Sequence, residues 1–193
     1  MTTVAFIGLG NMGSGMADNL VKNDYNVLAF DLSEAALAKA KEAGCTIAQS
    51  TEQAAAEADI VITMLPAGKH VKDIYSNQIL SSVCEGTLLI DCSTIDVETA
   101  KSVSELAEKK GLKMLDAPVS GGVAAAAGGT LTFMVGGDAD AFDKAHGVLS
   151  AMGKKIVHAG GHGAGQAAKI CNNMLLGATM IATCESFQLA QKL

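Results

Sequence analysis

The chain has 193 residues, a length that fits one domain of ordinary size or one domain with part of a second. Hydrophobic residues make up 49% of it, with 21 glycines and 2 prolines, which indicates a compact α/β protein rather than a disordered or fibrous one. The formal net charge is -6 and the basic residues form no cluster, so we expect binding neither to nucleic acid nor to a membrane.

The cysteines bear on the compartment. They contain no Cys-x-x-Cys pair and lie in apolar segments, as expected of buried free thiols in a reducing environment; they are Cys45, Cys84, Cys92, Cys171 and Cys184. No export or organelle signal precedes the first predicted strand, which favours the cytoplasm, or the mitochondrial matrix if a presequence is removed. The longest apolar run, 170–183, is interrupted by two asparagines and is too short to cross a bilayer. The 4 histidines lack metal-site spacing, so we expect no metal.

A glycine-rich turn follows the first predicted strand, Thr3–Ile7, and opens a helical pattern. It reads Gly8-Leu9-Gly10-Asn11-Met12-Gly13. The first glycine permits the tight turn, the second lets backbone approach a pyrophosphate, and the third allows the helix to pack closely on the strand. The N-terminus of that helix offers N–H groups to the anion. Because strand, turn and helix occur together, the pattern predicts a dinucleotide site.

Asp31 ends the second predicted strand, Asn26–Phe30, at the spacing expected for a ribose-binding acid. In that position its carboxylate would accept hydrogen bonds from the adenosine ribose diol, and no arginine follows to receive a 2′-phosphate. The cofactor is therefore expected to be NAD rather than NADP. The alternative is a turn or helix-cap aspartate, although Ser33 already offers a capping hydroxyl for the helix predicted at 34–43.

Short apolar runs alternate with helical patterns through the middle of the chain. Strands are predicted at 46–48, 59–66, 87–91, 113–116, 130–135 and 155–158, and helices at 52–58, 69–75, 97–110, 124–127 and 139–152. This alternation predicts a Rossmann-type α/β fold with a doubly wound, mostly parallel sheet. Since ligands bind outside the carboxyl ends of such strands, Leu65-Pro66, Ser93-Thr94 and Pro118–Gly122 should ring one cleft with the first glycine turn.

A second glycine loop, Gly160–Gly165, opens the last predicted helix, which carries one lysine in apolar company. Lys169 and Asn173 share a face of that helix, and we interpret Lys169 as a catalytic acid/base whose pKa is lowered by burial. The alternative is a lysine that snorkels from a buried helix beside a locally bonded asparagine. Ser120-Gly121-Gly122 offers a hydroxyl and free N–H groups to a small carboxylate, although alone it is equally consistent with a turn.

The last predicted helix runs from about Gln166 to about Lys192 without a proline. Apolar residues lie all round it, so it requires cover on every side, whereas one Rossmann layer covers only one. We therefore divide the chain into an NAD-binding Rossmann domain at 1–163 and a long interdomain helix at 164–193. We expect the helix to form a homo-oligomer, a dimer or higher, or to leave an apolar patch exposed.

Four ordered motifs beyond the first glycine turn resemble those of the β-hydroxyacid dehydrogenases, and the resemblance runs the full length. The motifs are Asp91–Thr94, Asp116–Gly122, Gly129–Gly137 and Gly165–Asn173. The resemblance implies hydride transfer between NAD and a small β-hydroxy acid, in the first place 3-hydroxyisobutyrate, which gives methylmalonate semialdehyde in valine catabolism. Reduction of tartronate semialdehyde, glyoxylate or succinic semialdehyde is the alternative within the family.

The resemblance also implies roles for individual residues. Ser120, Gly121 and Gly122 hold the substrate carboxylate, Lys169 is the acid/base and Asn173 places the substrate or the lysine. Thr94 lies by the nicotinamide, and Leu65, Pro66 and Ser93 belong to the same cofactor site. Family members continue for about another domain's length. A cofactor-binding fragment with little turnover, or a sensor that uses NAD only structurally, are therefore the other readings.

Overall fold

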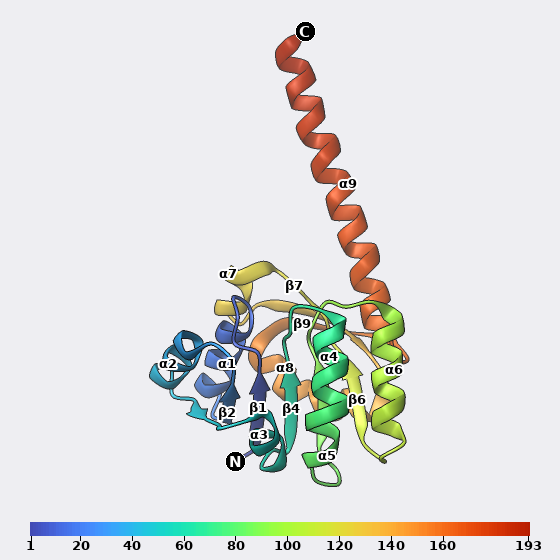
Figure 1. Ribbon diagram of the computed structural model, residues 1–193. Coiled ribbons are helices and arrows are strands. Elements are labelled where there is room, and N and C mark those ends of the chain that lie inside the picture. Colours follow the sequence, from blue (N-terminus) through green and yellow to red (C-terminus); the bar gives the residue numbers. More distant parts are fainter.

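A computed structural model describes residues 1–193. The molecule is a Rossmann-type sheet with helices on both faces and one long helix that projects from it (Figure 1). The strands follow the order β3-β2-β1-β4-β5-β6-β8-β7, with β9 on the free side of β8. Their bounds are β1 Thr3–Ile7, β2 Asn26–Phe30, β3 Thr46–Ile47, β4 Ile60–Thr63, β5 Leu88–Asp91, β6 Lys113–Asp116, β7 Val119–Ser120, β8 Leu131–Gly136 and β9 Gly153–Gly160.

The sheet is mostly parallel, as the alternation of strands and helices predicts. Strands β1 to β6 pair in parallel, and β8 reverses direction, pairing antiparallel with β6 and with β7. Strand β9 returns parallel to β8. The two-residue β7 was not predicted, because two residues are too few to carry an alternating pattern. The carboxyl ends of the parallel strands all reach one edge of the sheet, which is the upper edge in Figure 1.

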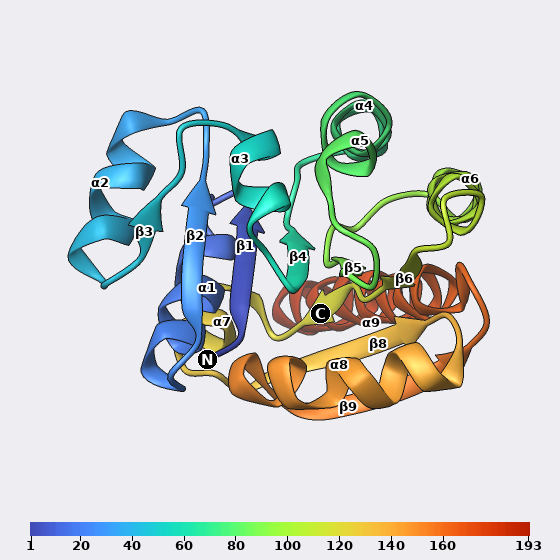
Figure 2. The same ribbon diagram turned by 90° about the horizontal axis from the view of Figure 1, so that it is seen from below.

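Two hydrophobic clusters, one on each face of the sheet, form the core. Figure 2 shows α3, α4 and α6 over one face and α1 and α8 over the other. Side chains of adjacent strand residues alternate between the clusters, so that Phe6 lies in one and Ile7 in the other. The helix bounds are α1 Gly13–Lys22, α2 Glu34–Glu42, α3 Thr51–Ala56, α4 Gly68–Ile74, α5 Leu80–Ser82, α6 Val97–Glu108, α7 Gly122–Ala127, α8 Ala139–Met152 and α9 Ala164–Lys192.

Two expectations need correction. The helix predicted at 69–75 does not stop there: α4 continues through a π-helical turn, η1 at Tyr75–Ile79, into α5. Burial of Tyr75 and Ile79 against the sheet holds this extra turn, an effect of tertiary packing that a local pattern does not reveal. The cysteines are all free, but only Cys45 and Cys92 are buried, whereas the other three lie on exposed surfaces of α9 and beside α5.

Helix α9 has 29 residues, and its buried residues are Gly165, Gln166 and Lys169. Beyond them the helix extends away from the domain into the surroundings (Figure 1). Its large apolar side chains are exposed there, at Ile170, Met174, Leu175, Leu176, Met180, Ile181, Phe187, Leu189 and, just past its end, Leu193. The cover that an all-round apolar helix requires is thus not supplied by residues 1–163. No helix of the chain combines the length and the apolar content needed to cross a bilayer.

Candidate active site

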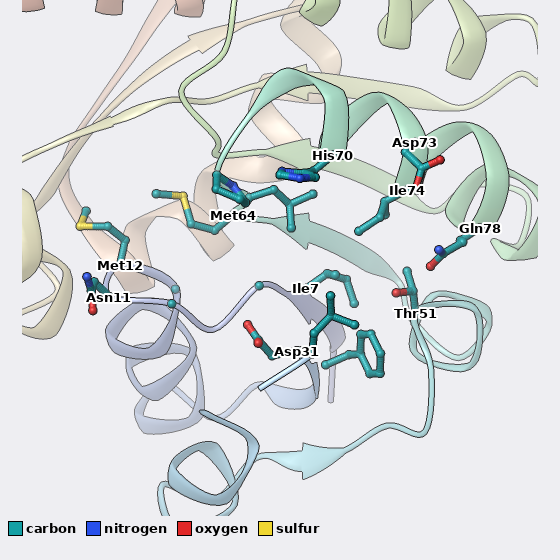
Figure 3. A pocket seen from close by; sticks show the side chains of 17 residues that line it. Ile7, Asn11, Met12, Asp31, Thr51, Met64, His70, Asp73, Ile74 and Gln78 are labelled. Carbon is teal, nitrogen blue, oxygen red and sulfur yellow. The ribbon is translucent and has the colours of Figure 1, made fainter. Parts of the chain in front are cut away.

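A cavity of about 660 Å³ opens at the carboxyl edge of the sheet, between the β1–α1 turn, the end of β2 and helix α4 (Figure 3). Its volume is within the usual range of ligand sites. Most of the predicted cofactor residues line it: Gly8, Gly10, Asn11, Met12, Gly13, Asp31, Leu65 and Pro66. Three do not, because Leu9 points into the core and Ser93 and Thr94 lie on the neighbouring loop after β5.

The β1–α1 turn has the shape of a dinucleotide cradle. Gly8 adopts a φ of +97°, and a Cβ there would collide with the carbonyl oxygen of Met64, so only glycine fits. By contrast, nothing lies within 4 Å of the place where Gly10 would carry a Cβ. The turn is therefore tight on its protein side and open on its cavity side, which suits the approach of a pyrophosphate to the backbone.

Asp31 follows β2 and lies beside the β1–α1 turn, and its carboxylate fixes the local backbone. One oxygen accepts a hydrogen bond from the Leu9 N–H at 2.6 Å and the other from the Ser33 N–H at 2.8 Å. Ser33 caps α2, its hydroxyl accepting from Ala36 at 3.4 Å. Asp31 is thus a turn aspartate that also lines the cavity (Figure 3).

The far end of the cavity is formed by residues that the sequence reasoning missed. Ile74, His70, Asp73 and Gln78 come from the α4–η1 helix, and Thr51 from the start of α3, facing Gln78 (Figure 3). The Thr51 hydroxyl is buried without a partner in the chain. Ile7, Phe30, Leu32 and Met64 complete the lining. The signal available was the position of His70, Ile74 and Gln78 at four-residue spacing on the helix that follows β4.

A buried polar network stands behind this cavity. One oxygen of Asp91, at the end of β5, accepts hydrogen bonds from the hydroxyls of Thr63 at 2.7 Å and Ser93 at 2.6 Å. The Ser93 hydroxyl in turn accepts from the Leu65 N–H at 2.8 Å. Burial, with a smaller contribution from nearby Asp116, raises the pKa of Asp91 to about 6 against the lowering effect of these bonds. The network holds the loops after β4 and β5 together.

The predicted carboxylate nest lies at the junction of β7 and α7. Gly121 has a φ of +132°, and a Cβ there would lie 2.5 Å from that of Ala125. The Gly122 position faces open space. Helix α7 is fixed to α1 by Asn19, whose amide donates to the carbonyls of Ala126 at 2.8 Å and Ala127 at 3.2 Å. The nest is outside the cavity, on the same edge of the sheet (Figure 1).

Lys169 has only 9% of its surface exposed, although it is the sixth residue of a helix that projects from the domain. This burial lowers the pKa of the Lys169 amine, because it disfavours the charged form. Asn173, one turn later, is exposed, and its side chain accepts a hydrogen bond from Asn172 at 3.3 Å rather than one from Lys169. Within this chain the two residues share a helix face without a mutual hydrogen bond.

The fold and the cavity define an NAD-binding Rossmann domain. Residues 3–161 match the family model described as the NAD binding domain of 6-phosphogluconate dehydrogenase, and the chain belongs to that family. The cofactor is NAD, and the longer proteins that the chain resembles include an NAD-dependent L-serine dehydrogenase.

Three relatives illustrate the resemblance. The chain is 53% identical to the 3-hydroxyisobutyrate dehydrogenase of Pseudomonas aeruginosa, covering 100% of this chain and 65% of the relative. It is 50% identical to the NAD-dependent L-serine dehydrogenase of the same organism, covering 98% of this chain and 64% of the relative. The structure of Mycobacterium tuberculosis 3-hydroxyisobutyrate dehydrogenase with L-serine superimposes with a TM-score of 0.97 at 51% identity, covering 100% of this chain and 66% of that one. The chain thus spans just under two thirds of their length.

Proposed function

We propose that the whole protein is an NAD-dependent dehydrogenase of small β-hydroxy acids, and that 3-hydroxyisobutyrate, oxidised to methylmalonate semialdehyde as in valine catabolism, is its substrate. The observation that carries the proposal is the burial of Lys169 three residues after Gln166, which hydrogen-bonds to the loop after β5 and to Asp116 of β6. Burial lowers the pKa of the Lys169 amine, as a base in such an enzyme requires. The names of the relatives support the choice of substrate.

In this proposal, the cavity residues hold the cofactor. The Gly8–Gly13 turn and the start of α1 bind the pyrophosphate, and Asp31 binds the adenosine ribose. Leu65, Pro66, Ser93 and Thr94 border the nicotinamide end. When bound, NAD supplies the acceptor for the hydride.

The chain's own residues handle the substrate and its proton. Ser120, Gly121 and Gly122 bind the carboxylate, and Asn173 orients the hydroxyl end. The neutral Lys169 amine takes the hydroxyl proton as the alcohol is oxidised, and the ammonium returns a proton to the developing alkoxide in the reverse direction. Burial supports this role, because an exposed lysine remains charged at neutral pH and cannot act as a base.

L-Serine is the second candidate substrate. It carries a hydroxyl on the carbon β to its carboxylate, as 3-hydroxyisobutyrate does, and two of the relatives are named for it or were solved with it. The same nest and the same lysine would serve both substrates, so the proposed residue roles do not depend on the choice.

We also infer that residues 1–163 form the cofactor domain and that residues 164–193 form an interdomain helix through which the protein forms a homo-oligomer. The exposed apolar residues of α9 support this, since such a surface is normally covered. The free cysteines suit a reducing compartment, the cytoplasm or the mitochondrial matrix.

Steady-state rates of the whole protein test the proposal. We expect 3-hydroxyisobutyrate with NAD to give the highest kcat/KM, ahead of L-serine, glycerate and 4-hydroxybutyrate, and NADP to be the poorer cofactor. The proposal is wrong about the substrate if one of the other acids exceeds 3-hydroxyisobutyrate. It is wrong about the reaction class if none of them reduces NAD.

A further inference from the structure

Helix α9 is attached to the domain through a very short stretch. Its buried residues, Gly165, Gln166 and Lys169, all fall within its first two turns, and every residue from Thr179 onward is exposed. The place of Lys169 relative to the sheet therefore depends on the few contacts that fix the start of the helix. Those contacts are made by Gln166 and its neighbours.

The side chain of Gln166 joins the helix to the loop after β5. The residue is fully buried, its amide nitrogen donates to the carbonyl of Ser93 at 2.7 Å, and its amide oxygen accepts from the Ile95 N–H at 3.2 Å. These two backbone groups flank Thr94, whose side chain remains exposed. One amide thus fixes the backbone on both sides of the residue that the proposed function puts beside the nicotinamide.

The backbone of Gln166 is fixed as well, by a carboxylate from β6. Asp116 accepts hydrogen bonds from the Gly163 N–H at 2.7 Å and the Gln166 N–H at 2.9 Å. Gly163 is the N-cap of α9 and has no side chain of its own, so Asp116 supplies the capping oxygen from outside the helix. The ends of β5 and β6 and the start of α9 therefore meet at one residue.

We propose that Gln166 is a positioning residue, which sets the distance between the Ser93–Ile95 loop at the cofactor and the Lys169 amine and keeps water from that amine. This role deepens the proposed function and rests on it. Gln166 and Lys169 are three residues apart and so lie on one face of α9. A shift of the helix start relative to the loop would displace the base from the cofactor and expose it to solvent.

Several charged and titratable groups lie around the start of α9, among them Lys101 of α6, whose Cε lies 3.0 Å from where a Cβ of Gly163 would stand. Asp116 binds the Gln166 N–H, Asp91 binds Ser93, and His162 precedes the helix with its Nε2 2.9 Å from a Glu108 oxygen. None of them forms a salt bridge with Lys169, and burial is the cause of the lowered pKa of its amine. The contacts of Gln166 therefore act on Lys169 by positioning its amine and by excluding solvent from it.

Titration of Lys169 by NMR in the 193-residue chain tests the proposal without any turnover. In Gln166→Met, which keeps the length of the side chain but neither hydrogen bond, we expect the pKa of Lys169 to rise toward that of an exposed lysine. The matched control is Val103→Ala, which removes core contacts from α6, the helix after the same loop, and should leave the pKa of Lys169 where it is. The proposal is overturned if the pKa of Lys169 is unchanged in Gln166→Met, or if it rises equally in Val103→Ala.

A second variant decides the matter if Gln166→Met does not fold. Gln166→Glu is isosteric and can make both hydrogen bonds only while its carboxyl is protonated. In the whole protein we expect kcat to approach that of the wild type at acidic pH and to fall by about a hundredfold once the carboxyl ionises. A pH profile parallel to that of the wild type contradicts the proposal. If the wild type oxidises no hydroxy acid, the proposed function fails, and the lysine titration still decides the role of Gln166.

Discussion

The Rossmann domain and the outer part of α9 are both rich in apolar residues, yet one buries them and the other exposes them. Every residue of β4 and β5 is buried between two helical layers. In α9, Met174 and Ile181 are 72% and 67% exposed. Apolar sequence therefore shows that a segment needs cover, but not whether the cover lies within the same chain.

The same comparison separates two parts of the proposed chemistry. The cofactor cavity lies wholly within the covered domain, from the β1–α1 turn to the α4–η1 helix. Lys169 lies near the start of α9, whose outer part is exposed, and Asn173, one turn further along, is already exposed. Cofactor binding should therefore be a property of the domain, whereas turnover should depend on what covers α9.

Removing the base gives the largest expected effect. In the whole protein, Lys169→Ala should lower kcat by about 10²–10⁴-fold and leave NAD affinity unchanged, because the amine acts on the substrate hydroxyl. Lys192→Ala, a lysine at the exposed end of the same helix, is the matched control and should behave as the wild type. Steady-state rates and calorimetric titration with NAD provide the two readouts. A Lys169→Ala variant that keeps more than about a tenth of the rate would refute the role.

Replacing Asp91 by asparagine tests how the ionisation of this buried carboxyl affects the stability of the Rossmann domain. The pKa of Asp91 in the folded protein, about 6, lies above the ordinary value of 3.8 for an aspartate, so folding disfavours its ionisation. Stability is therefore lost as the pH rises from 3.8 to about 6, by about 3 kcal/mol at one pKa unit per 1.4 kcal/mol. D91N keeps the oxygen that accepts from Thr63 and Ser93 and cannot ionise.

Urea unfolding at pH 4 and at pH 7 measures this effect. Between these two conditions the stability of D91N relative to the wild type should rise by about 2 kcal/mol, since part of the loss has already occurred at pH 4. Asp143→Asn, at an exposed position of α8, serves as the control for a general charge effect. A difference between D91N and the wild type that does not change with pH would show that Asp91 does not titrate in this window.

Changing Asp31 tests the cofactor end of the covered domain. Asp31→Asn should weaken NAD by about tenfold, since one of two acceptor oxygens is lost, and should narrow the preference over NADP, since the charge that repels a 2′-phosphate is gone. Calorimetric titration of the 193-residue chain with both cofactors measures this. An unchanged ratio of the two affinities counts against the ribose role.

The smallest effect on cofactor binding and rate is expected from substitutions on the exposed outer part of α9, which should change only self-association. We expect the 193-residue chain to self-associate through α9, and Leu175→Glu combined with Ile181→Glu to make it monomeric with its NAD affinity intact. Gln188→Glu adds charge to the same helix without removing an apolar side chain and should leave association as it is. Sedimentation velocity across a range of concentrations distinguishes the three. A wild-type chain that sediments as a monomer throughout would exclude this mode of association.

The sequence predicted the architecture well because the strands of the sheet are short apolar runs with clear ends. Gly8 and Asp31 were recognisable because only certain residues fit those turns. Gln78 was missed because its approach to the cavity depends on a π-helical turn held by tertiary packing. Thr51 was missed because it belongs to a separate element, the start of α3. Gln166 lies within a motif that the sequence revealed, but its contacts were not predicted, because its partners Ser93 and Ile95 lie more than 70 residues away along the chain.

The most direct test of the division between the covered domain and the uncovered helix compares the 193-residue chain with the whole protein in the same buffer. Titration calorimetry with NAD and the rate with 3-hydroxyisobutyrate are measured on both. We predict equal NAD affinity and a much lower rate for the 193-residue chain, because the cavity is complete within residues 1–163, whereas Asn173 and the rest of α9 beyond Lys169 are uncovered. Equal rates, or NAD binding by the whole protein alone, would contradict the account.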